Sequence, residues 1–135
     1  MTTKTTGSNA DQHAVLDVLK GVYEAWEAND AEAFVADYFD DASVVQPGVY
    51  RKNRQEIQSS MAGAFAGPLK GSRVIDQPQD VRFLSEDAAI VISEGGILFP
   101  GQDSVSSEGR VRATWVLAKR DNRWFVAAYH YSAAN

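Results

Sequence analysis

The sequence predicts an α+β domain in which helices cover one face of an antiparallel sheet. Apolar residues recur at helical spacing in the first half of the chain, whereas the residues beyond Gly71 alternate as strands do. The length of 135 residues fits one hydrophobic core. We therefore expect a polar tail over residues 1–8 and a single domain over residues 9–135.

Composition excludes several classes of function. The 18 Asp and Glu residues exceed the 13 Lys and Arg residues, and the net charge of −5 opposes binding to nucleic acids and anionic membranes. The chain has no cysteine and only two histidines, which leaves little for a metal site or a thiol nucleophile. The longest apolar run, residues 88–92, is too short to cross a bilayer, and the polar start lacks a secretory signal. We expect a cytoplasmic protein.

The first two elements are predicted to form a helical hairpin. Apolar residues from Val15 to Trp26 recur at helical spacing, and Asn9 with Gln12 resembles a capping box. Asn29 would end this helix in a left-handed conformation, and Asp30 would cap the next helix. The apolar face of that second helix would carry Phe34, Val35, Tyr38 and Phe39.

A short strand and a third helix follow. Residues 43–46 read as a strand that stops at the turn residues Pro47–Gly48, with a brief partner strand beyond the turn. Asn53 and Glu56 have the spacing of a helix start, and Gly67–Pro68 would end this third helix.

The rest of the chain is predicted to form strands. Their approximate ranges are 73–84, 87–99, 109–119 and 123–132. Asp121–Asn122 is a hairpin turn whose residues tolerate positive φ. The Gly95–Gly96 pair is interpreted as a bulge or bend in its strand.

The turn at Asp121–Asn122 also predicts the phase of the last hairpin. It pairs Lys119 with Trp124, Leu117 with Val126, Trp115 with Ala128 and Ala113 with His130. The face assigned to the helices then carries Ala113, Trp115, Leu117, Trp124, Val126, Ala128 and His130. The opposite face is partly apolar too, so we expect a second copy to cover it in a two-fold homodimer. A monomer with a few exposed aromatic residues is the alternative, and a register slip of one residue would exchange the faces.

His130 is the strongest candidate for proton chemistry, because imidazole exchanges protons near neutral pH. The alternative is a hydrogen-bonded core histidine. Five helical residues, Tyr23, Trp26, Tyr38, Met61 and Phe65, would form the wall of a site for a flat hydrophobic ligand, or else belong to the core. Glu94 would act as an acid or base if it faces inward, and would be an ordinary solvated charge if it faces outward.

Motifs for phosphate, dinucleotide, serine hydrolase and zinc protease chemistry are missing from the sequence, so we expect no cofactor.

Two stretches carry a family resemblance. AWEANDAEAFVADYFDDASVVQPGVYRKNRQEI, from Ala25 to Ile57, and RDNRWFVAAYHYS, from Arg120 to Ser132, resemble the SnoaL-like branch of the nuclear transport factor 2-like superfamily. The pieces AWEAND, FAGPLKGSR, DVRFLSEDAAIVIS and RATWVLAKRDNRW are similar to the SgcJ/EcaC family of enediyne biosynthetic clusters. The resemblance extends from about Asn9 to Ser132.

This resemblance implies a cone-shaped, cystatin-like α+β barrel, with three N-terminal helices packed on a strongly curved, mixed but mostly antiparallel sheet. It also implies a cavity between the first helix and the sheet, a homodimer through the sheets, and a role in making a polyketide-derived product. Enzymes of the superfamily place an acidic base in the cavity, but no Asp here matches those positions. Gln46 lies where the isomerases carry their base, and a glutamine cannot act as one.

The combined hypothesis is a cofactor-independent cyclase or isomerase that acts on a hydrophobic polyene or polyketone. His130 would be the acid or base and Tyr23 a hydrogen-bond donor. The expected substrate-binding residues are Trp26, Tyr38, Gln46, Met61, Phe65, Glu94 and Trp115. The alternatives are a non-catalytic carrier of the intermediate and a dimeric interaction module with a vestigial cavity. A polyketide synthase or another pathway enzyme is a possible partner.

Overall fold

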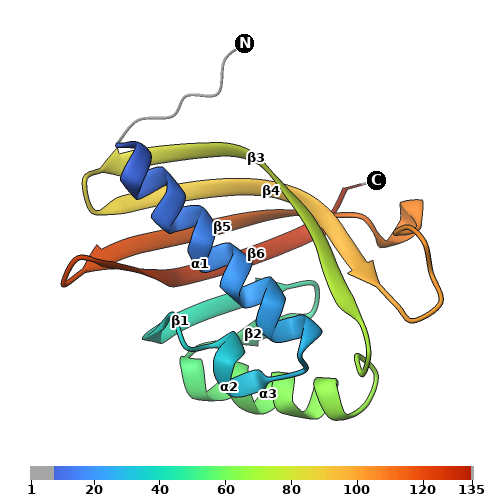
Figure 1. Ribbon diagram of the computed structural model, residues 1–135. Helices are drawn as coiled ribbons and strands as arrows, with labels where there is room; N and C mark the ends of the chain where they lie inside the picture. Colours follow the sequence, from blue (N-terminus) through green and yellow to red (C-terminus); the bar gives the residue numbers. More distant parts are fainter. Residues whose placement is uncertain (1–7, 135) are drawn as a thin grey trace.

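The computed structural model describes residues 8–134 and shows helices on one side of a curved sheet (Figure 1). The helices are α1 (Asn9–Glu27), α2 (Ala31–Phe34) and α3 (Arg54–Ala66), with a short 3₁₀ helix at Ser107–Gly109. The strands are β1 (Tyr38–Gln46), β2 (Val49–Arg51), β3 (Arg73–Ser85), β4 (Ala88–Leu98), β5 (Val111–Arg120) and β6 (Arg123–Ala133). Of the tail predicted over residues 1–8, all but Ser8 lies outside the described residues.

The six strands form one sheet in the order β2-β1-β6-β5-β4-β3. In the described part of the chain, β1 and β6 run parallel and the other neighbours antiparallel. The sheet curls without closing, α1 crosses its concave face, and α2 and α3 lie together beside the end of α1 (Figure 1). The predicted α+β architecture is confirmed.

Helix α1 forms because its apolar stripe meets the sheet. Val15, Leu19 and Val22 on this stripe are all buried. The N-cap is Ser8, whose Oγ accepts a hydrogen bond from the amide of Asp11 at 3.0 Å, so the prediction of Asn9 as the cap is wrong by one residue. None of the helices within residues 8–134 combines the length and apolar character needed to cross a bilayer.

Helix α2 is shorter than predicted. Asn29 adopts φ of 54° and Asp30 caps the helix, both as expected. However, Tyr38 and Phe39 belong to β1 rather than to the helix. Tyr38 pairs with Val126 across the parallel ladder, and its side chain is only 1% exposed. Strand pairing and burial therefore override the local helical pattern.

Helix α3 and the turn of the first hairpin follow the prediction, but β1 begins at Tyr38 rather than at residue 43. The Asn53 side chain accepts a hydrogen bond from the amide of Glu56 at 2.8 Å, and Gly67 is the C-cap. Gly48 has φ of 74° in the turn that joins β1 to β2, a left-handed conformation that glycine adopts without steric penalty.

A β-bulge divides the last hairpin into two parts with different phases. Lys119 pairs with Trp124 and Leu117 with Val126, as predicted, but the next pair is Val116 with Ala128. The extra residue is Ala127. Beyond it, Trp115 pairs with Tyr129 and Thr114 with His130. The predicted pairs Trp115–Ala128 and Ala113–His130 are therefore wrong, because one extra residue exchanges the two faces of a strand.

A second bulge lies in β3, between Pro78 and Asp80. A bulge or a bend was predicted at Gly95–Gly96, and the bulge is wrong, because the pairing of β3 with β4 runs through these residues without interruption. The glycines have a different role. A Cβ on Gly95 would lie 1.9 Å from the carbonyl oxygen of Ile75, and one on Gly96 would lie 2.5 Å from Val105 Cγ1. Only glycine allows the backbone to approach this closely.

Candidate functional site

The concave face carries a carboxyl group that is hydrogen-bonded to a phenol. The hydroxyl of Tyr23, on α1, donates to Oδ2 of Asp76, on β3. Both residues are half-buried, so solvent reaches them in part. Within residues 8–134, no ion pair neutralises Asp76. The helix and the strand therefore place an unpaired carboxyl group in partly apolar surroundings.

These surroundings shift the proton affinities of the cluster. Burial raises the pKa of Asp76 above its ordinary value of 3.8, although the hydroxyls of Tyr23 and Ser93 oppose the rise. Burial and the charge of Asp76 raise the pKa values of Tyr23 and Tyr129 as well. The phenols therefore stay protonated and can donate hydrogen bonds.

The neighbours of Asp76 follow from the strand register. Asp76 pairs with Gly95, and Ser93 lies two residues along β4. Ser93 pairs with Ala113, and Trp115 lies two residues along β5. Residues two apart in a strand share a face, so Asp76, Ser93 and Trp115 form a diagonal line across three strands.

Tyr23 contacts both ends of this diagonal line, Asp76 and Trp115. Besides its bond to Asp76, its ring meets that of Trp115 edge-on, with the centroids 6.1 Å apart. Trp115 also contacts Tyr129, the residue opposite it on β6, with ring centroids 4.3 Å apart. We call the set of Tyr23, Asp76, Ser93, Trp115 and Tyr129 the Tyr23–Asp76 site.

Three of the predicted ligand-binding residues lie in a separate aromatic cluster. The ring centroids of Trp26 and Phe65 are 5.6 Å apart, and both rings contact Phe34, which also packs on Tyr38. The indole of Trp26 donates to Ser72 Oγ at 2.9 Å. Burial raises the pKa of Tyr38, which remains a neutral phenol. In this structure the cluster is core, the alternative that the sequence left open.

Gln46 and Met61 come from different elements, Gln46 from the end of β1 and Met61 from α3. Gln46 follows Val44 by two residues, and Val44 pairs with Tyr129, so Gln46 shares the face of Tyr129. Met61, on α3, is half-buried against the core.

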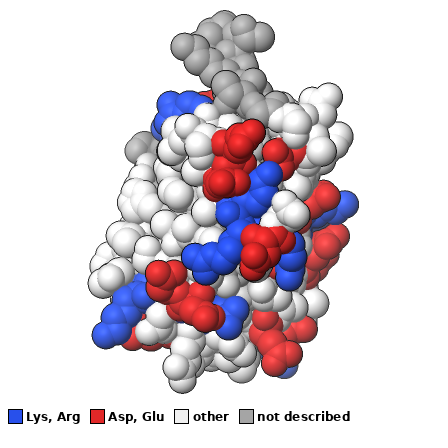
Figure 2. Space-filling model, turned by 90° about the vertical axis from the view of Figure 1, so that its left-hand side faces the viewer, with Lys and Arg blue, Asp and Glu red and all other residues white. Residues whose placement is uncertain are grey.

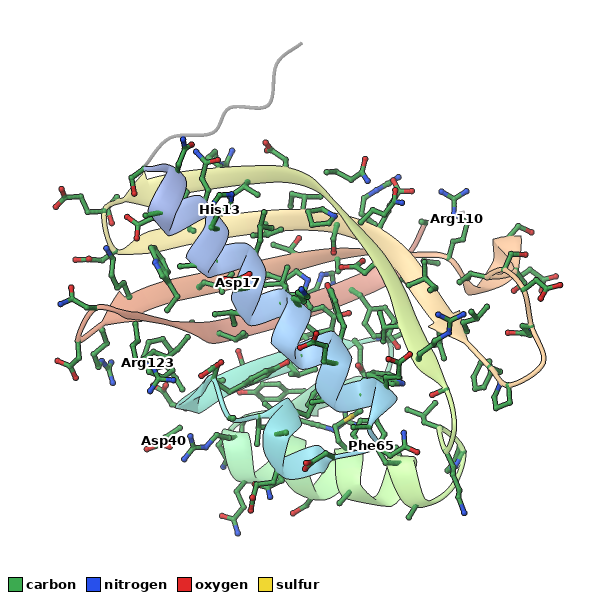
Figure 3. All side chains as sticks on the ribbon, in the orientation of Figure 1. His13, Asp17, Asp40, Phe65, Arg110 and Arg123 are labelled. Atoms are coloured by element: carbon green, nitrogen blue, oxygen red, sulfur yellow. The ribbon has the colours of Figure 1, made fainter. Side chains whose placement is uncertain are left out.

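Glu94 and His130 lie on the outer face of the sheet. The Glu94 carboxylate accepts hydrogen bonds from Arg112 and Arg110, each at 2.7 Å, and these guanidinium groups hold its pKa below the ordinary value. Figure 3 shows Arg110 at the end of the molecule that carries the loop before β5. His130 is exposed and pairs with Val45 and Thr114. The prediction that His130 faces the helices is wrong, because the bulge at Ala127 reverses its side.

Two surface pockets include none of the five residues of the Tyr23–Asp76 site. One of about 380 Å³ lies between β3, the end of β4 and the loop before β5, and includes Arg73, Glu94 and Arg110. The other, of about 250 Å³, includes Asp40 and Arg123, which Figure 3 shows at one end of the molecule. Acidic and basic side chains alternate over this end (Figure 2). No residue of α1 lines either pocket, so neither is the cavity expected between the first helix and the sheet.

Among residues 8–134, no three His, Asp or Glu side chains come together as a metal site.

The site residues that the sequence analysis missed are Asp76, Ser93 and Tyr129. The local signal for Asp76 was weak, because it is one of two acidic residues in a largely polar stretch of the strand predicted over residues 73–84.

Comparisons with known proteins agree with this architecture. A domain of unknown function with a cystatin-like fold from Nostoc punctiforme superposes with a TM-score of 0.87, at 24% identity, over 95% of this chain and 80% of that chain. A ketosteroid isomerase-like protein from Erwinia carotovora atroseptica has a TM-score of 0.74, 19% identity, and coverage of 95% and 99%. A candidate dehydratase of the NTF2-like family from Streptomyces avermitilis has a TM-score of 0.74, 24% identity, and coverage of 94% and 98%.

These likenesses show the fold, which is the cystatin-like, NTF2-like α+β fold. Among curated proteins, none matches the sequence. The family model described as a SnoaL-like domain matches residues 15–135, which is most of the chain. The chain therefore belongs to the family of SnoaL-like domains.

Proposed function

We propose that this protein binds a small, uncharged and largely apolar molecule at the Tyr23–Asp76 site and transfers a proton on it, as in an isomerisation or a dehydration. The observation that carries the proposal is the half-buried Asp76 carboxyl, held by the Tyr23 hydroxyl and without a neutralising cation among the described residues. Because burial raises its pKa, the Asp76 carboxylate is a stronger base than an exposed one and can both take and return a proton.

The proposed reaction follows from the protonation states of Asp76 and Tyr23. The Asp76 carboxylate would remove a proton from a carbon next to a carbonyl group, leaving an enolate. Returning that proton to another carbon completes an isomerisation. Delivering it to a β-hydroxyl group, as the enolate expels that group, releases water and completes a dehydration. Tyr23 remains protonated throughout and positions the carboxylate.

The substrate we propose is a polyene or polyketone intermediate of polyketide biosynthesis. The aromatic rings of Trp115 and Tyr129, tilted at 47° to each other, form apolar walls beside Asp76. The sequence resemblance to the SgcJ/EcaC family supports a polyketide, and the names of the Erwinia and Streptomyces neighbours support the reaction class. Neither mechanism needs a cofactor.

The test combines a simple probe with the proposed substrate class. The planar methyl ketone 2-acetylnaphthalene is incubated in D₂O, and deuterium entering its methyl group is measured by mass spectrometry. We expect Asp76→Asn to lower the enzyme-dependent rate by about 10²- to 10⁴-fold, the usual contribution of a positioned base. Glu94→Gln is the matched control, because it removes a carboxylate from the outer face. An unchanged rate in Asp76→Asn would contradict the mechanism.

A polyene from an iterative polyketide synthase is then incubated with the same three proteins. A new product that depends on Asp76 supports an enzyme of polyketide biosynthesis. Polyene that is bound but chemically unchanged contradicts turnover and supports the second candidate function.

That second candidate is a non-catalytic carrier or interaction module. The observation in its favour is the packed interior, since Trp26, Phe34 and Phe65 contact one another and neither surface pocket adjoins α1. In this function Asp76 would bind a ligand without exchanging protons, and the deuterium experiment separates the two.

We also propose a homodimer through the outer face of the sheet. Ile90, Ile92 and Val116 lie there on adjacent strands and are half-buried in the single chain. A second copy would bury them. Sedimentation at micromolar concentration should give twice the chain mass, and Ile92→Lys should lower it to that of one chain. A wild-type mass of one chain would refute the dimer.

A further inference from the structure

Two polar groups of the concave face are buried beside each other's strands with little to bond to. Among residues 8–134, Trp115 Nε1 has no hydrogen-bond partner, and the Ser93 hydroxyl has none beyond its interaction with Asp76, although their residues are only 3% and 0% exposed. An unpaired buried donor is costly, so native proteins rarely retain one without a reason. Both groups belong to the Tyr23–Asp76 site, where the reason is expected to be a ligand.

The contrast with the other two tryptophans makes Trp115 distinctive. Trp26 Nε1 donates to Ser72 Oγ at 2.9 Å, and Trp124 Nε1 donates to Asp11 Oδ1 at 3.1 Å. The fold therefore provides an acceptor for each of these two indoles. Trp115, in contact with Tyr23 and Tyr129, keeps a free N–H.

We propose that Trp115 Nε1 and Ser93 Oγ form a polar subsite that binds an uncharged oxygen of the ligand, in the first instance a ketone oxygen. The subsite rests on the proposed function, because it adjoins Asp76 on the same face. The indole N–H only donates, while the Ser93 hydroxyl can turn to donate as well, so both groups suit an oxygen acceptor. A carboxylate or phosphate is disfavoured, because Asp76 is close and no cation is paired with it in the described residues.

Together with Asp76, this subsite provides a partner for both the oxygen and the acidic C–H group of a ketone. Its oxygen accepts from Trp115 and Ser93, and its acidic C–H lies toward Asp76. Hydrogen bonds to that oxygen would also stabilise the charge that develops there when Asp76 removes the proton. The sequence analysis assigned Trp115 to an apolar wall, whereas its N–H is here a specificity-determining group.

The test uses the indole N–H signals of the ¹⁵N-labelled protein. Its three tryptophans give three such signals, and those of Trp26 and Trp124 are internal controls because their N–H groups are already paired. The probes are 2-acetylnaphthalene and its isostere 2-isopropenylnaphthalene, in which a CH₂ group replaces the oxygen. We expect the ketone to move the Trp115 signal downfield, and the hydrocarbon to leave it without that shift.

Affinity provides the second readout. One neutral hydrogen bond should make the ketone bind about two- to tenfold more tightly than the hydrocarbon. Trp115→Phe should bring that ratio close to one, and Ser93→Ala should lower it. If Trp115→Phe does not fold, Ser93→Ala and the wild-type spectra still show whether the subsite binds the ketone oxygen. A Trp115 signal that stays unmoved at millimolar ketone, or that moves equally with both probes, overturns the subsite.

The subsite and the proposed function can fail separately. A Trp115 shift that persists in Asp76→Asn, together with no deuterium exchange in the wild type, upholds the subsite and removes the catalytic function. Deuterium exchange that depends on Asp76 while Trp115 stays unmoved upholds the catalytic function and removes the subsite.

Discussion

The indole Nε1 of Trp124 donates to Oδ1 of Asp11 at 3.1 Å, which fastens the first turn of α1 to the last strand of the sheet. Lys119 Nζ lies 3.2 Å from the same carboxylate oxygen. These contacts hold the start of α1, the helix that carries Tyr23 at its other end. The position of Tyr23 over the concave face therefore depends on contacts between residues more than 100 positions apart.

Asp11 should stabilise the fold in a pH-dependent way. The Trp124 hydrogen bond, with further help from Lys119, holds the pKa of Asp11 below its ordinary value of 3.8. A lowered pKa means that the stabilisation is present above pH 3.8 and is lost as the pH falls through the native value. We expect Asp11→Asn to be less stable than the wild type in urea at pH 7, with the difference shrinking toward pH 2. A difference that is constant with pH would contradict this assignment.

Asp76 should have the opposite effect. Because burial raises its pKa, the folded protein binds a proton more tightly than the unfolded chain, and stability decreases as the pH rises above 3.8. Asp76→Asn keeps an oxygen acceptor for the Tyr23 hydroxyl but carries no charge. Its stability relative to the wild type should therefore increase from pH 4 to pH 7 in urea unfolding.

Glu94→Gln is the matched control for the direction of this pH dependence of stability. The pKa of Glu94 is lowered by Arg112 and Arg110, so this variant should lose stability relative to the wild type as the pH rises. If both variants respond to pH in the same direction, the assigned environments of the two carboxyl groups are wrong.

The Trp26–Ser72 hydrogen bond should contribute measurably to stability. Ser72 is 1% exposed and supplies the acceptor for the indole of Trp26 at 2.9 Å. Ser72→Ala leaves that donor unpaired and should lower the free energy of unfolding by about 1–3 kcal/mol. The double variant Trp26→Phe, Ser72→Ala completes a mutant cycle in urea. Additive effects of the two substitutions would show that the hydrogen bond contributes nothing.

Gly95 should tolerate no side chain. Its added Cβ would lie 1.9 Å from the carbonyl oxygen of Ile75 and 2.7 Å from Cα of Asp76, both backbone atoms. We expect Gly95→Ala to lower the free energy of unfolding by at least about 3 kcal/mol. Gly63→Ala is the control, since nothing lies within 4 Å of the added Cβ, and a helical alanine there should stabilise by about 0.5–1 kcal/mol. Equal effects of the two substitutions would contradict the close approach at Gly95.

Local signals in the sequence were enough to predict most of the elements. Asp30 and Asn53 cap their helices, and Asn29 adopts the positive φ that ends the first one. These features depend on the chemistry of neighbouring residues, so a single sequence reveals them. The second helix was predicted too long because Tyr38 is buried by a strand pair with Val126, a contact that no local pattern reports.

The sequence by itself determined the fold class, the N-caps of α2 and α3, the order of strands along the chain and the start of the last hairpin. Only the tertiary structure decided which side chains meet at the site, because two bulges each exchange the faces of a strand. The extra residue before Asp80 places Asp76 on the same face as Val81, although strict alternation would separate them. The extra Ala127 turns Tyr129 inward and His130 outward. Each bulge depends on pairing with another strand, which local sequence patterns do not encode.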